Sequence, residues 1–163
     1  MLQQTRVEAV KAYYNRFTAE LPTIADLAAC QEEKLLKLWE GLGYYNRVRN
    51  MQKAAIQVMT QYHGEMPHSY EELLKLPGIG SYTAGAVASI AYGIPVPAVD
   101  GNVLRVITRM TANYGDITKQ NTKDEITKQL QAIMPKQHAG DFNQALMELG
   151  ATCLLYTSPS PRD

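Results

Sequence analysis

One carboxylate in this sequence stands where it can do chemistry. Asp100 opens the helical pattern of "VDGNVLRV" after a break at residues 93–97, and Asn102 lies two residues further on. A carboxylate in this place can cap the helix that follows. It can also stabilise positive charge on a substrate sugar, as carboxylates do in glycoside hydrolysis. The two roles are compatible, because capping fixes the direction of the same side chain.

A glycine-rich turn precedes this carboxylate by about twenty residues. In "LPGIGSYTAGAVASIA", Pro77 ends one helical pattern, and Gly78 and Gly80 permit positive φ and a close backbone approach. The helix that follows presents unpaired N–H groups at its start, and these suit a phosphate. From the residues alone the turn is either an ordinary helix–helix connection or a phosphate-binding site.

Two adjacent tyrosines follow another pair of glycines. Gly41 and Gly43 suggest a loop that displays a side chain, which favours exposure of Tyr44 or Tyr45. The alternative for either ring is core packing beside Trp39, and we expect it to hold for one of the two. Arg47, Arg49 and Lys53 follow on the same stretch and either line a nucleic acid or form a solvated helix face.

Helical periodicity dominates the rest of the chain. Apolar residues step by three and four in five stripes: Val7, Val10, Tyr14, Phe17 and Leu21; Leu35, Leu38, Trp39 and Leu42; Val48, Met51, Ala55, Val58 and Tyr62; Ile126, Leu130 and Ile133; and Phe142, Ala145, Leu146 and Leu149. Thr23, Ser69 and Asp100 are expected N-caps. We therefore predict an all-α protein with eight or nine short helices.

Composition narrows the class of protein. The chain has 163 residues, a formal net charge of zero and two cysteines, Cys30 and Cys153. It can bury a real core, and its neutral charge argues against a generic DNA-coating protein. We find no membrane-spanning run, no signal peptide, no metal-ligand cluster and no disulfide framework. A reducing, cytoplasmic setting is the default expectation.

Four separated motifs resemble one enzyme family. "LPGIG" with the following "TA", and then "VDGNVLRV", are similar to the hairpin and the aspartate segment of helix-hairpin-helix DNA glycosylases. "MLQQTRVEAVKAYYNRF", "LWEGLGYYNRVRNMQKAA" and "FNQALMELGA" resemble MutY-type adenine DNA glycosylases. The resemblance runs from Met1 to about Ala151. It implies a six-helix barrel domain at 1–98 with a helix-hairpin-helix at about 69–92, and part of an iron–sulfur cluster domain at 99–152, with the active site in the cleft between them.

The resemblance implies an activity and a set of DNA contacts. The family excises adenine mispaired with 8-oxoguanine or guanine in double-stranded DNA during base excision repair, and it must flip the adenosine out of the helix. Gln4 would fill the vacated space, Tyr44 would insert beside the 8-oxoguanine, and Thr5 and Leu42 would contact the orphaned base. With the turn and the basic residue, the expected DNA contacts are Gln4, Thr5, Leu42, Tyr44, Arg47, Gly78 and Gly80.

The resemblance also assigns the chemistry. Asp100 would stabilise the oxocarbenium ion or trap it transiently, and Asn102 would orient it. Bifunctional relatives carry a lysine that forms a Schiff base at the position of Tyr82. Neither Ser81 nor Tyr82 can form an imine, so we predict a monofunctional hydrolase in which Tyr82 assists the site. Two alternatives stay open: a non-catalytic helix-hairpin-helix DNA-binding module, and a glycosylase with lyase activity like endonuclease III.

Two parts of the family pattern are missing from these residues. The family's general-acid glutamate would stand two residues before Met1. Its [4Fe-4S] cluster needs four cysteines in a C-x6-C-x2-C-x5-C run, the first of them four residues after Gly150. Cys153 stands three residues after Gly150, with no cysteine following, so we expect no cluster ligand here. We interpret 153–163 as a non-native or disordered tail and expect a fragment truncated at both ends and nearly inactive.

Overall fold

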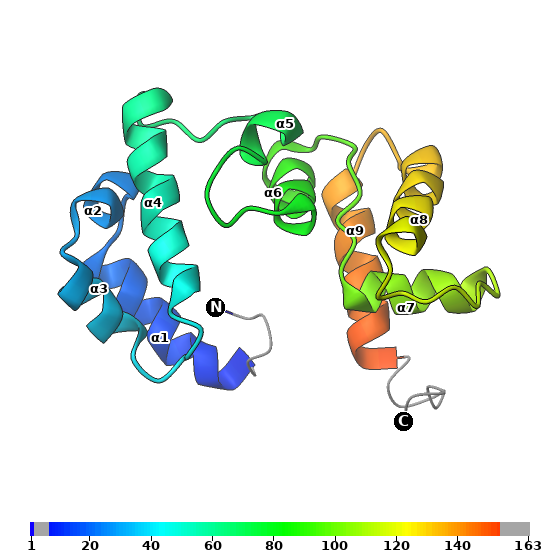
Figure 1. Ribbon diagram of the computed structural model, residues 1–163, viewed down its shortest axis with the longest axis horizontal. Helices are drawn as coiled ribbons and strands as arrows, with labels where there is room; N and C mark the ends of the chain where they lie inside the picture. The colour runs from blue at the N-terminus through cyan, green and yellow to red at the C-terminus, as the bar shows by residue number, and fades with distance from the viewer. Residues whose placement is uncertain (2–6, 154–163) are drawn as a thin grey trace. The chain divides into compact units, whose positions relative to one another are not determined.

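The protein is all-α in a computed structural model that describes Met1 and residues 7–153, with the side chains of Val7 and Cys153 excepted. Its helices are α1 (Val7–Glu20), α2 (Ile24–Ala29), α3 (Glu32–Trp39), α4 (Asn46–Gln61), α5 (Tyr70–Leu73), α6 (Ser81–Tyr92), α7 (Gly101–Met110), α8 (Gln120–Ile133) and α9 (Ala139–Glu148), followed by a π-helical turn, η1 (Leu149–Cys153) (Figure 1). No strand occurs in this part of the chain, which confirms the predicted fold class. Thr23, Ser69 and Asp100 each cap a helix, as predicted.

The chain divides into two compact units. The first comprises Met1–Pro67 with Lys75–Gly78, and the second comprises His68–Leu74 with the residues from Ile79 onward. The separate prediction of a domain boundary near residue 98 stays a prediction. None of the helices described is long and apolar enough to cross a membrane.

The core of the first unit forms where α1 packs on α3 and where α2 and α3 pack on α4. Phe17 meets Trp39 edge to face, with ring centroids 6.0 Å apart, and Leu35 and Val48 are fully buried beside them. Tyr14 departs from the predicted stripe of α1, because 57% of its surface is exposed. A tyrosine tolerates such a position because its hydroxyl remains in water.

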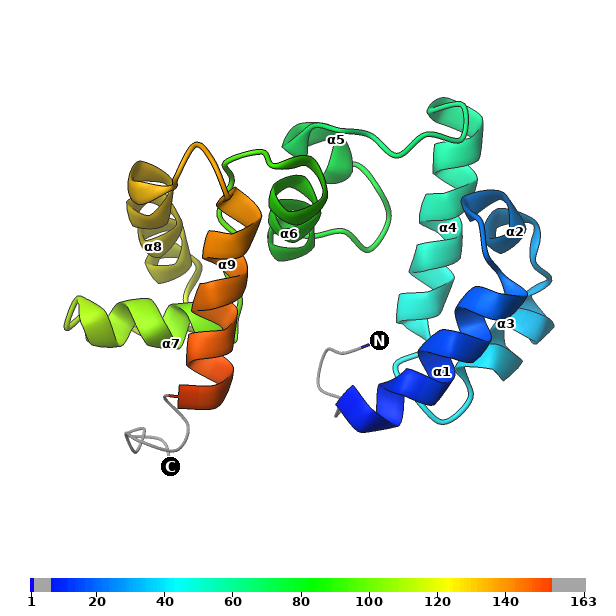
Figure 2. The same ribbon diagram turned by 180° about the vertical axis from the view of Figure 1, so that it is seen from behind.

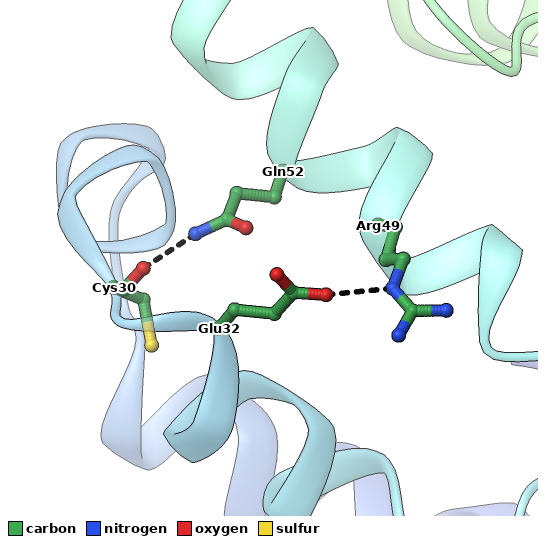
Figure 3. Close-up of polar contacts among 4 residues, drawn as sticks. All are labelled: Cys30, Glu32, Arg49 and Gln52. Carbon is green, nitrogen blue, oxygen red and sulfur yellow. Dashed lines mark hydrogen bonds and ion pairs between the residues drawn. The ribbon is translucent and has the colours of Figure 1, made fainter.

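Polar contacts anchor the joint between α2 and α3 to α4 (Figure 3). Gln52 Nε2 donates to the Cys30 carbonyl at 2.5 Å, and Arg49 Nε donates to Glu32 Oε1 at 2.7 Å. Since Glu32 lies in the first turn of α3, its charge also suits the helix N-terminus. Arg49 is therefore paired within the protein.

The second unit is built on helix contacts that centre on α7 and α9. α6 packs on α9, and α7 packs on both α8 and α9, as the reverse view in Figure 2 shows for these helices. Val103, Val106, Ile126 and Leu130 are buried between α7 and α8. The turn η1 contacts both α7 and α9. This packing places the C-terminal end of α9 against the first turn of α7, where Asp100 stands.

Candidate functional site

Asp100 is the N-cap of α7, and both of its carboxylate oxygens are occupied. Oδ1 accepts from the Val103 backbone N–H at 2.8 Å, and Oδ2 accepts from Asn102 Nδ2 at 3.1 Å. The side chain is partly buried. Each carboxylate oxygen keeps a second lone pair, so the group is fixed in direction and can still face a substrate. The predicted capping role is confirmed, and the predicted pairing of Asp100 with Asn102 is present.

Arg105 extends this arrangement and was not identified from the sequence. Its Nη2 donates to Asn102 Oδ1 and to the Gly150 carbonyl, each at 2.7 Å. Arg105 lies three residues after Asn102, a spacing that brings two side chains together on a helix. This spacing was the sequence signal from which Arg105 could have been found. The result is a chain of hydrogen bonds from η1 through Arg105 and Asn102 to Asp100.

Tyr82, in the first turn of α6, belongs to the same neighbourhood. Its hydroxyl lies 3.8 Å from the Met147 sulfur on α9. Burial, and secondly the negative charge of Asp100, raise the pKa of Tyr82 above its usual value. The tyrosine therefore stays neutral at physiological pH and keeps a hydroxyl proton to donate. The structure thus brings the three expected catalytic residues into one unit, while their roles stay predictions.

The glycine turn before α6 uses its two glycines differently. Gly78 has a φ of +77°, and a Cβ there would stand 2.7 Å from Asn50 Cβ on α4. Gly80 has a φ of −92°, so of the two glycines only Gly78 uses the positive φ that both permit. A Cβ on Gly80 would meet open space, and no side chain caps α6 there. The N-terminus of α6 therefore keeps N–H groups available for an anion.

The loop between α3 and α4 presents Tyr44. This ring is 64% exposed, and its backbone adopts a φ of +49°, a conformation that bulky residues avoid. The Trp39 indole N–H donates to the Gly43 carbonyl at 2.9 Å, and the Arg47 guanidinium lies 4.7 Å from the Tyr44 ring centroid. Strained backbone conformations that the surrounding structure holds in place cluster at functional sites, and Tyr44 is therefore a candidate functional residue.

The remaining predicted contacts differ in position. Tyr45 is also exposed, at 38%, so the expectation that one of the two tyrosines packs in the core is wrong. Leu42 is partly buried against the core cluster of the first unit. Gln4 and Thr5 lie outside the described residues. Their predicted roles on DNA stay predictions.

The residues present do not fit an iron–sulfur cluster. A [4Fe-4S] cluster takes four thiolates, whereas the whole sequence contains two cysteines. Within the described ranges, no group of three or more His, Cys, Asp or Glu side chains could hold a metal ion. Cys30 is a free, partly buried thiol in the first unit.

Comparison with known protein families gives a match over most of the chain. Residues 1–136 match the model of the HhH-GPD superfamily of base excision DNA repair proteins. The adenine DNA glycosylase of Mus musculus is 46% identical over 153 residues, which cover 93% of this chain and 30% of that protein. The adenine DNA glycosylase of Schizosaccharomyces pombe is 43% identical and is covered to 35% of its length. The chain thus spans about a third of these two relatives.

Solved structures share the fold. A non-covalent endonuclease III–DNA complex matches with a TM-score of 0.81 at 31% identity, covering 96% of this chain and 72% of that one. A thermostable thymine-DNA glycosylase matches with a TM-score of 0.84 at 25% identity, covering 97% of this chain and 73% of that one.

Proposed function

Since this chain belongs to the HhH-GPD superfamily of base excision DNA repair proteins, we propose that the enzyme containing it is an adenine DNA glycosylase. The observation that carries this choice of base is the 46% identity to a curated adenine DNA glycosylase over 93% of the chain. The substrate is adenine mispaired with 8-oxoguanine or guanine in double-stranded DNA. The reaction is hydrolysis of the N-glycosidic bond.

Asp100 stabilises the charge that this bond cleavage creates. When the bond from the sugar carbon to adenine breaks, the electron pair leaves with the base and the sugar becomes an oxocarbenium ion. A carboxylate held by Val103 N–H and Asn102 Nδ2 faces that charge without having to reorient. Water then adds to the sugar carbon and releases a proton.

Departure of adenine also requires a proton for the base. The family resemblance assigns that step to a glutamate two residues before Met1 in the family pattern. General acid catalysis contributes typically about 10²–10⁴-fold. We therefore propose that protonation of the base contributes to the rate alongside Asp100.

Tyr82 favours hydrolysis over strand cleavage. An imine with the sugar needs an amine at this position, and Tyr82 offers a hydroxyl that its raised pKa keeps protonated. We propose that this hydroxyl donates a hydrogen bond within the site. The enzyme is then monofunctional, unlike one that acts through a Schiff base.

DNA is held at two places. The uncapped N-terminus of α6 at Gly78 and Gly80 binds a backbone phosphate. Tyr44 stacks beside the 8-oxoguanine with Arg47 near its ring. Gln4 fills the space left by the flipped adenosine, and Thr5 and Leu42 contact the orphaned base. The enzyme acts as a monomer at the bacterial nucleoid.

The test is single-turnover excision by the full-length protein on an A:8-oxoguanine duplex, with a C:8-oxoguanine duplex as the control. Alkali-dependent strand breaks on the first duplex alone are expected. Breaks without alkali, together with a borohydride-trapped covalent adduct, would show the lyase alternative instead. Tight binding with no excision would leave a non-catalytic DNA-binding module and overturn the proposal.

A further inference from the structure

We infer that Asn143 is a positioning residue for Asp100, acting through the connection between α6 and α7. The inference rests on the proposed function for its catalytic consequence and on the geometry of the second unit for its structural one. Asn143 lies on α9, is 1% exposed and stands 43 positions from Asp100 in sequence. Asn143 is not among the site residues predicted from the sequence.

Every polar atom of the Asn143 amide is engaged. Its Nδ2 donates to the Ser89 hydroxyl at 2.8 Å and to the Val96 carbonyl at 2.9 Å. Its Oδ1 accepts from the Ala98 backbone N–H at 3.1 Å. One side chain therefore ties α6 to the connection and holds the connection at two places.

The first part of the connection has other contacts: the Ile94 N–H donates to the Ala88 carbonyl and Gln131 Nε2 donates to the Pro95 carbonyl, each at 3.0 Å. The part nearest Asp100 depends more on Asn143. Residues 93–100 form no regular element, and Pro95 and Pro97 have no backbone N–H to donate. The Val96 N–H is bound locally to the Ile94 carbonyl at 2.8 Å. The Ala98 N–H, fully buried, is satisfied by Asn143. Ala98 lies two residues before Asp100, so a shift of the connection moves the carboxylate.

A glycine on α9 allows α9 to lie close to α6, where Asn143 contacts Ser89. A Cβ on Gly140, one helical turn before Asn143, would stand 2.9 Å from the Ser89 carbonyl oxygen and from Ile90 Cα. Glycine lets the two helices come close enough for the Asn143 amide to reach across. An apolar residue of the same size would fill the space but leave the Ala98 N–H unsatisfied, which is costly for a buried donor.

The experiment measures position and rate separately in the full-length protein. Asn143→Ala removes all three hydrogen bonds. Asn143→Asp is a second variant in case the alanine variant does not fold: it keeps the shape of the side chain and an acceptor for the Ala98 N–H, but it loses the two hydrogen bonds that Nδ2 donates. Ser89→Ala is the matched control, because it removes the bond to α6 and leaves both bonds to the connection. Leu130→Ala is a destabilising control in α8. The readouts are amide exchange at Ala98 and Val103, DNA affinity, and single-turnover excision at saturating DNA.

We expect the Val103 amide hydrogen to exchange about ten times faster in the Asn143 variants than in Leu130→Ala, when the variants are compared at matched global stability. We expect excision to slow by about 10–10²-fold, the scale of an ångström misplacement, with DNA affinity changed less than about twofold. Ser89→Ala should keep most of the rate. Val103 exchange that follows only global stability, or equal slowing by Leu130→Ala, would overturn the inference.

The two proposals fail in different ways. If the unsubstituted enzyme excises no adenine, the proposed function fails, while Val103 exchange still decides whether Asn143 positions the Asp100 cap. If the enzyme is active and the Asn143 variants excise at its rate, the positioning inference fails and the function stands.

Discussion

The Tyr44 loop and the N-terminus of α7 present their key residues in opposite ways. Tyr44 is 64% exposed, in a strained backbone conformation, and its loop is secured by the Trp39 indole. Asp100 is partly buried, with both oxygens bonded and its partner Asn102 held in turn by Arg105. A residue that must enter a DNA helix needs reach, whereas a carboxylate that must face a developing charge needs a fixed direction.

Asp100→Asn tests the carboxylate side of this comparison and should have the largest effect. Loss of the negative charge is expected to slow single-turnover excision by about 10³-fold or more, in line with the loss of a preorganised electrostatic group. Asparagine caps helices about as well as aspartate, so the thermal midpoint should shift little. Unchanged excision with unchanged stability would remove Asp100 from the chemistry.

Arg105→Met asks whether the fixed direction matters. The variant keeps an unbranched chain of similar reach but loses the bonds to Asn102 Oδ1 and to the Gly150 carbonyl. We expect excision to slow by about 10–10²-fold and the free energy of unfolding to fall by about 2 kcal/mol, since hydrogen bonds to charged groups contribute about 1.5–3 kcal/mol. The control is Lys128→Met, on an exposed position of α8, which should leave both quantities unchanged.

Tyr44→Ala tests the exposed side, with Tyr45→Ala as the matched control. Loss of a base–aromatic stack of about 1–3 kcal/mol should weaken binding to the A:8-oxoguanine duplex by about 5–150-fold. Stability should change little, because the exposed ring contributes little packing and alanine disfavours the same left-handed conformation as tyrosine does. Equal effects of the two substitutions on DNA affinity would show that Tyr44 is not distinguished from its neighbour.

Tyr82→Phe should have the smallest effect among these substitutions. It tests whether the negative charge of Asp100 acts on the Tyr82 hydroxyl. The folded pKa of Tyr82 lies above the unfolded value of about 10. The unfolded chain therefore releases this proton first as pH rises, and Tyr82 lowers stability above about pH 10 while leaving it unaffected below. Denaturant titrations between pH 9 and 11 should show a shallower alkaline loss in Tyr82→Phe.

Tyr70→Phe is the control that separates the effect of burial on a tyrosine pKa from the effect of the Asp100 charge. Burial and Glu71 raise the pKa of Tyr70, so its contribution does not depend on Asp100. In the Asp100→Asn background the contribution of Tyr82 should shrink and that of Tyr70 should persist. An unaltered Tyr82 contribution in that background would mean that Asp100 does not reach the Tyr82 hydroxyl.

Much of the fold was predictable because local rules govern it. The apolar stripes predicted all-α structure, and the caps at Thr23, Ser69 and Asp100 depend on a side chain and a backbone N–H three residues apart. The stripes predicted helices and not the burial of each member: Tyr14 and Ile133 stand in them and are 57% and 64% exposed, because a stripe gives a helix face but not its outer limit. The glycines of the turn before α6 both permit positive φ, but only Gly78 adopts it, since residue type reveals tolerance of positive φ and not its use.

The sequence by itself determined the helices, the family and the capping carboxylate, because these depend on residues close together along the chain and on motifs. Only the tertiary structure decided that Arg105 reaches Gly150 and that Asn143 holds Ala98, contacts that each join residues 45 positions apart. It also decided that both tyrosines of the loop are exposed. Spacing along a helix cannot reveal which distant backbone group a polar side chain will meet, because that depends on how α6, α7 and α9 pack.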